Sequence, residues 1–506
     1  MKHIHNTLNN PVECSEQELL SVLERHRNTV FGRKHDFANI RTPEDFSRKV
    51  PLSDYQSVKP YLDRVYENPR GGILTSDPVV WYLKTSGSSG QPKVVPTTSQ
   101  GLKQASKGGS ALWLSFIDQH PSNIEILDGS MLLFGAPAIV DYINDIPFGY
   151  ASGCYARHQN KIFSRLIAPR EDVLNITDID EKMRAYAEIA SQNSITALQG
   201  IATLNLAFVW KMQEQYGPWL LKLLRGTKHE QRIRSALDSD GRLDVGALWP
   251  ELQLFVVGGV DTDPHREWIH RTLPNVTIWE AYAASEGFIG SQVLPGKGVQ
   301  LLPDLNYLEF IPEAEVELPE PTVIPLSDVK KGCRYELVIT NVNGWYRYRL
   351  GDMVTFSETD PYTVRHISRL GGVVNLAGEK ITEAHVARAL YEACKDTGAE
   401  IVDYSLVGMT DERVPYYVLA VMFRTDLVSP KYFVSLFEKA IMKSNYEFYH
   451  SRAMGGLGPT RIRIMKSSFY EDIVRKTHVQ AKPIHLTIDT SVLARCESQS
   501  YSSTSL

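Results

Sequence analysis

Short apolar runs that end in glycine-rich or polar loops recur along this chain and alternate with helix-like segments. The run VVWYLK (79–84) leads into TSGSSG, LQLFVV (252–257) ends in a glycine pair, and VTIWEAY (276–282) leads into AASEG. Residues 179–193, 198–216 and 264–275 have the spacing of helices. This alternation of strand, loop and helix predicts an α/β domain that contains much parallel sheet.

The pattern changes near Cys333. Residues 334–356, RYELVITNVNGWYRYRLGDMVTF, predict β-strands around a turn at Asn343-Gly344. Beyond Arg369, alternating strand and helix signals predict a small α+β domain, and the glycines at 371–372 mark the boundary. We therefore expect a large N-terminal domain over 1–369 with mixed and parallel sheets and flanking helices, a small mobile C-terminal domain over 370–489, and a disordered Ser- and Thr-rich tail over 490–506.

Composition narrows the function classes. The chain has 506 residues, 43% hydrophobic and 22% charged, which is typical of a globular protein with more than one domain. A net charge of -5 argues against nucleic acid as a partner. The five cysteines form no CxxC pair or metal-ligand spacing, which favours a reducing compartment. The N-terminus does not resemble a secretory signal, so we expect a cytoplasmic protein, monomeric by default.

The most apolar region covers residues 195–210. It is interrupted by Gln199 and Asn205 and is too short and too polar to span a bilayer. Its lack of charge predicts a buried helix, and no membrane contact is expected.

The loop at 85–93, TSGSSGQPK, concentrates hydroxyls, glycines and one lysine. Converging backbone N–H groups, hydroxyl donors and a nearby cation are what a phosphate needs. The loop matches neither the NTPase P-loop, nor G-x-G-x-x-G, nor G-x-S-x-G, and Pro92 prevents a regular helix from running through it. By itself the loop fits either a polar turn or a phosphate-binding loop.

Three further stretches bear on that choice. A Gly-Gly turn at 258–259 follows one strand, Tyr282 and Glu286 follow another four residues apart, and Asp352 ends WYRYRLGD (345–352). Together they supply an aromatic ring for a base, one carboxylate for a ribose and another for Mg²⁺, with the hydroxyl loop for phosphates. The set therefore suits a nucleotide.

These motifs resemble those of the adenylate-forming superfamily, which includes acyl-CoA synthetases, luciferases and peptide-synthetase adenylation domains. TSGSSGQPK is similar to its Ser/Thr/Gly loop, YAASE (282–286) to its Tyr-x-x-Ser/Thr-Glu motif, and RLGGVVNLAGEKITE (369–383) to its hinge. Within it, the chain most resembles the auxin-responsive acyl-acid amido synthetases. That resemblance is carried by PLSDYQSVKPYLDRV (51–65), NGWYRYRLGD (343–352), LAGEKITE (376–383) and VQAKP (479–483).

The resemblance implies a role for each matching position. Glu286 would hold Mg²⁺, and Lys482 would be the catalytic lysine of the C-terminal domain. Tyr282 would stack on adenine. The remaining ATP-binding positions would be Thr85, Ser86, Gly87, Ser88, Ser89, Gly90 and Lys93 at the phosphates, Gly258, Gly259 and Val260 beside the base, Asp352 and Arg369 at the ribose, and Ser285.

The function implied is that of an ATP-dependent acyl-acid amido synthetase, a ligase that forms carbon–nitrogen bonds. Such an enzyme activates a small carboxylic acid as acyl-AMP, releases pyrophosphate, and transfers the acyl group to an amine such as an amino acid. ATP and Mg²⁺ would be its cofactors. The alternatives are an acyl-CoA synthetase, which forms a thioester, and an inactive ATP-binding regulatory protein.

Overall fold

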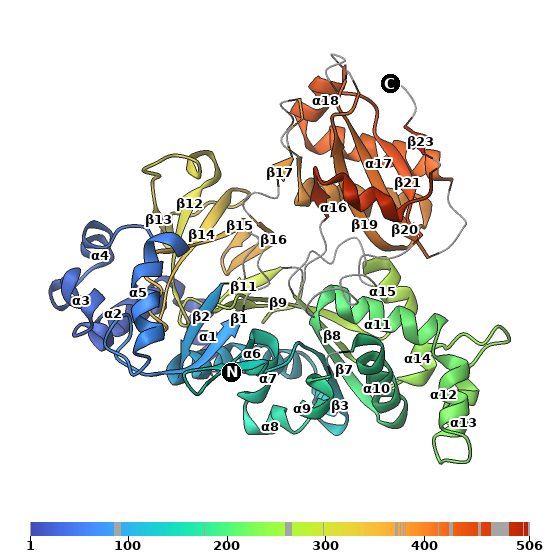
Figure 1. Cartoon of the computed structure of the whole chain (residues 1–506), viewed down its shortest axis with the longest axis horizontal. Coiled ribbons are helices and arrows are strands. Elements are labelled where there is room, and N and C mark those ends of the chain that lie inside the picture. The colour runs from blue at the N-terminus through green and yellow to red at the C-terminus, as the bar shows by residue number, and fades with distance from the viewer. Residues whose placement is uncertain are drawn as a thin grey trace. The chain divides into compact units, whose positions relative to one another are not determined.

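The chain divides into two compact units in the computed structural model (Figure 1). Unit 1 comprises Met1–Ile201, Glu251–Gly259 and Thr277–Ile367, and unit 2 comprises Ala202–Pro250, Val260–Val276 and Ser368–Leu506. The structure describes all residues except 1, 85–92, 177, 259–265, 297, 370–372, 375, 378, 380, 413, 425–428, 454–456, 467–484, 499 and 504–506. Unit 2 thus gathers segments from the middle of the chain together with its C-terminal part.

The helices of unit 1 flank its sheets and come mostly from its first 192 residues. The α-helices are α1 (Lys2–Asn9), α2 (Pro11–His26), α3 (Val30–Lys34), α4 (Pro43–Lys49), α5 (Tyr55–Glu67), α6 (Ser99–Gln119), α7 (Ala151–Arg157), α8 (Lys161–Ser164), α9 (Glu171–Leu174) and α10 (Ile179–Gln192). The 3₁₀ turns are η1 (Phe37–Asn39), η2 (Pro121–Asp128), η4 (Glu313–Glu315) and η5 (Leu326–Asp328).

A twelve-stranded sheet runs through unit 1 in the order β13-β12-β14-β15-β16-β11-β10-β9-β8-β7-β3-β6. Its strands are β3 (Ser130–Phe134), β6 (Ile167–Ala168), β7 (Ile195–Ile201), β8 (Leu254–Gly258), β9 (Thr277–Ala283), β10 (Phe288–Ser291), β11 (Val299–Leu301), β12 (Tyr307–Pro312), β13 (Ile324–Pro325), β14 (Arg334–Thr340), β15 (Tyr348–Thr359) and β16 (Tyr362–Arg369). Strands β6, β3, β7, β8 and β9 pair in parallel, whereas β9 pairs antiparallel with β10. Strand direction therefore changes at β9.

A second sheet of unit 1 has four strands in the order β2-β1-β5-β4. They are β1 (Val79–Lys84), β2 (Val94–Thr98), β4 (Asp141–Ile143) and β5 (Ile146–Tyr150). β1 and β2 are antiparallel, and Lys84 lies opposite Val94. The hydroxyl-rich loop thus leaves the carboxyl end of β1 and returns directly into β2.

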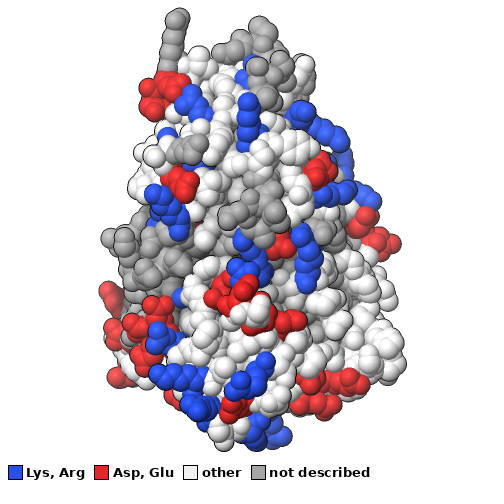
Figure 2. All heavy atoms as spheres, turned by 90° about the vertical axis from the view of Figure 1, so that its right-hand side faces the viewer, with Lys and Arg blue, Asp and Glu red and all other residues white. Residues whose placement is uncertain are grey.

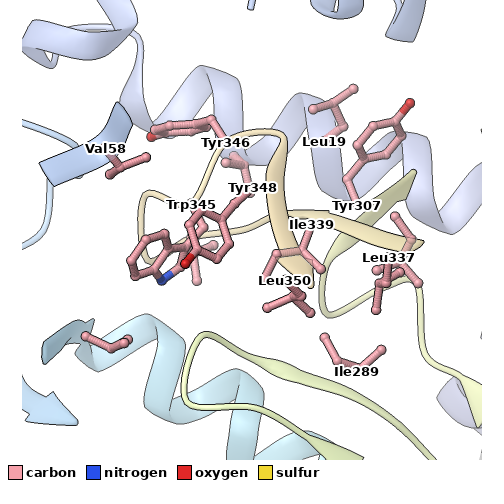
Figure 3. Packing of buried hydrophobic residues seen from close by; sticks show 14 of the residues in the cluster. Leu19, Val58, Ile289, Tyr307, Leu337, Ile339, Trp345, Tyr346, Tyr348 and Leu350 are labelled. Carbon is pink, nitrogen blue, oxygen red and sulfur yellow. The ribbon is translucent and has the colours of Figure 1, made fainter. Parts of the chain in front are cut away.

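A large apolar core holds the N-terminal helices against the antiparallel part of the large sheet. Leu19 from α2, Val58 from α5 and Ile339 from β14 are buried in one cluster with the aromatic run Trp345–Tyr346–Tyr348 (Figure 3). The Tyr346 ring stacks on Phe31 with the ring centroids 4.7 Å apart. Aromatic burial on this scale fixes the start of β15, the strand that carries Asp352.

The C-terminal part of unit 2 is an α+β layer, and its middle part is helical. The C-terminal elements are β17 (Val373–Val374), β18 (Ile381–Thr382), α16 (Glu383–Thr397), β19 (Ile401–Met409), β20 (Tyr416–Phe423), α17 (Pro430–Ser444), α18 (Tyr446–Ala453), β21 (Arg461–Ile464), β22 (Leu486–Thr487), η6 (Thr490–Arg495) and β23 (Tyr501–Ser502). The middle elements are α11 (Ala202–Glu214), α12 (Gly217–Leu223), α13 (Glu230–Ala236), α14 (Val245–Leu248) and α15 (Arg266–Thr272).

Helix α16 shows how local sequence sets the limits of an element. Thr382 caps its N-terminus in a reciprocal capping box with His385, and the helix stops where Gly398 adopts a φ of 69°. Its apolar face packs into the C-terminal core beneath strands β19 and β20. This agrees with the α+β domain expected beyond Arg369.

Two local expectations differ from the structure. The segment 198–216 was expected to be one helix, but β7 occupies its beginning and α11 starts only at Ala202. The chain after Asp489 was expected to be disordered, but η6 forms there and β23 pairs with β21. Val492 and Leu493 are buried in an apolar cluster, and this burial outweighs the polar composition of the tail.

Basic and acidic side chains are intermingled on the face that Figure 2 presents. Within unit 2, Arg234 pairs with Glu230 at 2.7 Å and Arg242 pairs with Glu214 at 3.0 Å. No helix among the described residues is both long and apolar enough to cross a membrane.

Candidate active site

Tyr282 and Asp352 meet inside unit 1. Tyr282 lies near the end of β9, Asp352 lies in β15, and each is only 6% exposed. The Tyr282 hydroxyl donates to Asp352 Oδ2 at 2.8 Å. Residues 70 positions apart, both selected from the sequence, therefore form one buried pair.

Glu286 lies in a tight turn between β9 and β10. The backbone N–H groups of Ala284 and Gly287 donate to each other's carbonyl oxygens at 2.9 and 3.3 Å, so only Ser285 and Glu286 form the loop. Glu286 is 7% exposed, and its carbonyl oxygen accepts from Asn341 Nδ2 at 2.9 Å. The turn thus places this carboxylate at the change of strand direction.

Tyr155 on α7 braces the same turn. Its hydroxyl donates to the carbonyl oxygens of Ala284 and Ser285, at 3.4 and 3.5 Å. Burial raises the pKa of Tyr155, and the neighbouring Cys154 and Glu286 add to the shift. The phenol therefore remains protonated at neutral pH and keeps its role as a donor.

The expected turn after β8 begins at Gly258. A Cβ atom added to Gly258 would lie 2.9 Å from the carbonyl oxygen of Ala281 on the neighbouring strand β9. This close approach explains the glycine, because a side chain would push the two parallel strands apart. Gly259 and Val260 lie outside the described residues.

The flanks of the hydroxyl-rich loop are described, but its centre is not. Thr85, Ser86, Gly87, Ser88, Ser89 and Gly90 lie outside the described residues. Lys84 places its Nζ 5.5 Å from the ring centroid of Tyr150, and Lys93 places its Nζ 5.1 Å from that of Tyr55. Cation–π contacts thus hold both ends of the loop against aromatic rings.

The remaining expected site residues belong to the C-terminal side of the chain. Arg369 is the last residue of β16, and its side chain is not among those described. Lys482 also lies outside the described residues. The roles expected for these two residues stay predictions.

The donor set around Glu286 fits a nucleotide-bound magnesium ion. Mg²⁺ at such sites takes one or two protein carboxylates and completes its coordination with phosphate oxygens and water. Among the described residues, no three His, Cys, Asp or Glu side chains gather into a metal-binding group. One carboxylate on a turn, such as that of Glu286, is the kind of protein ligand that Mg²⁺ uses when a triphosphate supplies other oxygen ligands.

Sequence reasoning missed a group of buried amides under this turn. Asn306 and Asn341 are each 1% exposed and Asn343 is 6% exposed. The available signal was the placement of uncharged polar residues in the otherwise apolar segment LVITNVNGWY, where only the Asn343-Gly344 turn was recognised. Their partners come from distant segments, which no local pattern identifies.

Solved structures share this fold along nearly the whole chain. The GH3.15 acyl acid amido synthetase aligns with a TM-score of 0.80 at 17% identity and covers 99% of this chain and 97% of its own. A 2-hydroxyisobutyryl-CoA ligase in its postadenylation state aligns with a TM-score of 0.56 at 13% identity and covers 95% and 90%. The chain therefore shares the fold of these two enzymes.

Comparison with models of protein families identifies the family to which the chain belongs. The GH3 family N-terminal domain matches residues 1–192, the GH3 family central domain 299–369 and the GH3 family C-terminal domain 384–485, so the chain belongs to the GH3 family. The indole-3-acetic acid-amido synthetase GH3.2 of Arabidopsis thaliana is 23% identical over 478 residues, which cover 83% of this chain and 85% of that protein. The 4-substituted benzoates-glutamate ligase GH3.12 of the same plant is 23% identical over 488 residues, or 85% and 84%. The expected family and fold class are confirmed.

Proposed function

We propose that this chain is an ATP-dependent acyl-acid amido synthetase. The observation that carries the proposal is the buried Tyr282–Asp352 pair beside the Glu286 turn, in a chain that three GH3 domain models match in order. The relatives named above are an indole-3-acetic acid-amido synthetase and a benzoates-glutamate ligase. Their names support a carboxylic acid and an amino acid as the two substrates.

The chemistry has two balanced steps. In the first, a carboxylate oxygen attacks the α-phosphorus of ATP and the bond to pyrophosphate breaks, which leaves an acyl-AMP. In the second, an amine nitrogen attacks the acyl carbon, the bond to AMP breaks, and the nitrogen loses a proton. Each step needs charge neutralised on phosphate oxygens and the reactants held close together.

Each residue's proposed role follows from that need. Tyr282 and Asp352 would hold the nucleoside, with the hydroxyl of Tyr282 fixing the orientation of the carboxylate. Ser88 and Ser89 would hold the departing phosphates. Glu286 would hold Mg²⁺, which when bound neutralises phosphate charge. Lys482 would place a point charge between the acid and the α-phosphate.

A panel of carboxylic acids tests the proposal. Acid-dependent exchange of pyrophosphate into ATP should appear with one or more aryl, indole or aliphatic acids. Added amino acids should then give an amide and AMP. Glu286→Gln should abolish exchange, and the Ser88→Ala/Ser89→Ala double variant should weaken it without unfolding the protein. Absence of exchange across the whole panel would leave only an ATP-binding regulatory role.

Thioester formation is the second candidate, because the fold is shared with a CoA ligase. Adding coenzyme A in place of amino acids distinguishes the two. AMP release that depends on coenzyme A and not on any amine would replace the amido synthetase with an acyl-CoA synthetase.

A further inference from the structure

The buried amides connect the Glu286 turn to the segment that leaves the hydroxyl-rich loop. Asn341 Nδ2 donates to the Glu286 carbonyl oxygen at 2.9 Å and to Asn306 Oδ1 at 2.9 Å. Asn306 Nδ2 in turn donates to the carbonyl oxygen of Phe288 at 2.6 Å. Two amides thus hold the turn on both of its sides.

The same chain of hydrogen bonds continues to β2. Asn341 Oδ1 accepts from the backbone N–H of Asn343 at 3.0 Å. Asn343 Oδ1 accepts from both the backbone N–H and the hydroxyl of Thr98, at 2.9 and 3.0 Å. Thr98 ends β2 and caps α6 by accepting from the N–H of Gly101 at 3.1 Å. An unbroken amide path therefore joins the strand after the loop to Glu286.

Glycines leave room for these amides. A Cβ atom on Gly101 would lie 2.1 Å from Asn343 Oδ1, and one on Gly287 would lie 2.7 Å from Asn306 Oδ1 and 3.0 Å from Asn341 Nδ2. Gly287 directly follows Glu286, and Gly101 lies in the first turn of α6, just after β2. The packing is thus shaped around the asparagine side chains.

A buried chain of hydrogen-bonded amides costs folding free energy that apolar packing would not cost. Each buried amide must keep its partners, because an unpaired amide in the interior is strongly unfavourable. Such a network in return permits one arrangement of the segments that it joins, since any shift breaks several bonds together. That is the property needed where a metal-binding carboxylate must keep one position.

We propose that Asn341, linked to Thr98 through Asn343, is a positioning residue that holds the Glu286 turn in place relative to β2, the strand that follows the hydroxyl-rich loop. The inference rests on the proposed function and adds to it a buried residue that acts through Glu286. Displacing a reacting group by about 1 Å can cost about 100-fold in rate. Loss of the Asn341 donors should therefore weaken the use of Mg²⁺ and ATP and leave the affinity for the acid unchanged.

Asn341→Asp is the sharpest variant. It keeps the size of the side chain and the acceptor for the Asn343 N–H, but it removes both donated bonds. Gln300→Glu is the matched control. Gln300 is a buried amide of the same unit whose Oε1 accepts from Val293 and Leu294 and whose Nε2 donates to Thr363 Oγ1 at 3.2 Å. Each change converts a buried amide into an acid.

Two readouts separate positioning from general loss of stability. In pyrophosphate exchange, Asn341→Asp should raise the Mg²⁺ concentration for half-maximal rate about tenfold or more, with the KM for the acid within about twofold of wild type. In thermal unfolding, it should lose the extra stabilisation that ATP gives with Mg²⁺ compared with ATP and a chelator. Gln300→Glu should retain both properties even if its melting temperature falls.

The Gly287→Ala variant is a second way to disturb the Asn306–Asn341 pair. It alters no polar group but crowds Asn306 and Asn341, so its Mg²⁺ dependence should shift in the same direction. This variant carries the test if Asn341→Asp does not fold.

A wild-type Mg²⁺ dependence in the folded Asn341 and Gly287 variants overturns the inference and leaves the proposed function standing. A wild-type protein without any acid-dependent exchange overturns both.

Discussion

The hydrogen bond between Tyr282 and Asp352 links a ring and a carboxylate that the sequence selected separately. If the pair holds the nucleoside, Tyr282→Phe should raise the KM for ATP about tenfold, equivalent to about 1.4 kcal/mol, because Asp352 loses its orienting donor. The KM for the acid should not change. Steady-state kinetics with ATP and acid varied in turn measure the effect.

Tyr346→Phe is the control for that substitution. Its hydroxyl, in the same unit, donates to the carbonyl oxygen of Leu74 at 2.6 Å. Loss of this bond should lower stability by about 1 kcal/mol and leave the KM for ATP unchanged. An equal rise in KM in both variants would mean that Tyr282 has only a packing role.

Arg347 has a structural role that its motif does not reveal. It is 6% exposed, forms a bidentate pair with Glu309 at 3.1 Å, and donates to the carbonyl oxygens of Ser47 and Val50. Its backbone φ is 44°, which an arginine adopts only when its surroundings compel it. The side chain thus joins the α4 region to β15.

Arg347→Met should therefore destabilise the protein by about 3–5 kcal/mol, because it leaves Glu309 buried and unpaired. Burial already raises the pKa of Glu309, and the guanidinium opposes that rise. Adding Glu309→Gln should recover part of the loss. Urea unfolding of the two single variants and the double variant measures the coupling, and strictly additive losses would contradict it.

At the scale of single residues, sequence reasoning found the chemically distinctive side chains and missed those that hold them. Glu286 stands out because it follows a strand in a recognisable motif, and Asp352 because it ends the motif WYRYRLGD, although the structure places Asp352 within β15 and not at the end of a strand. Asn341 and Arg347 depend on partners such as Glu286 and Glu309, which are distant along the chain. Spacing alone carries no information about such pairs.

Helices and strands were predictable where the hydrophobic periodicity and the residues at the ends of a segment indicated the same type of element. Helix α10 begins and ends close to the expected 179–193, with Asp178 as its N-cap. The helix predicted for the apolar run 195–210 is wrong over its first part, because a short buried run has no periodicity that separates strand from helix. Pairing of β7 between β3 and β8 decides that its first part is a strand.

Helix α2 ends in a buried histidine whose titration no sequence pattern indicated. His26 is fully buried, and its Nδ1 accepts from the backbone N–H of Ser76 at 3.0 Å. Burial lowers the pKa of His26 to about 4, against a smaller opposing effect of Asp77. The unfolded chain, with a histidine pKa near 6.5, therefore binds more protons than the folded chain between these two values.

Stability should consequently fall as pH decreases from about 6.5 to 4, by up to about 1.4 kcal/mol per pH unit from this histidine alone. His26→Gln should be less stable at pH 7 but should show a shallower slope in that window. Urea unfolding at pH 7, 6, 5 and 4 measures the slope. His120→Gln, at an exposed position, should keep the wild-type slope; if His26→Gln keeps it too, His26 is not responsible.

At the scale of the whole molecule, a single domain boundary near residue 370 does not fully describe how the chain divides into two compact units. The middle segments Ala202–Pro250 and Val260–Val276 belong to the same compact unit as the C-terminal part. Arg424, 14% exposed, pairs with Glu214 at 3.7 Å and Glu400 at 3.6 Å, and Arg271 pairs with Glu400 at 3.1 Å. A local sequence pattern does not reveal ion pairs between distant segments. The sequence therefore predicted the C-terminal domain but not its association with α11 and α15.

Adenylation in the proposed cycle requires a group from the C-terminal part of the chain, and Lys482 is the proposed group. Lys482→Ala should lower acid-dependent pyrophosphate exchange by about 100- to 1000-fold, the usual effect of losing one group that stabilises developing charge. Transfer from a supplied acyl-AMP to an amine should be much less affected, because the mixed anhydride is already a good electrophile and this step mainly needs the amine to be held close to it. Lys476→Ala, in the same segment, is the matched control and should behave as wild type. Intact exchange in Lys482→Ala, or an equal loss in Lys476→Ala, would assign the adenylation charge to another residue.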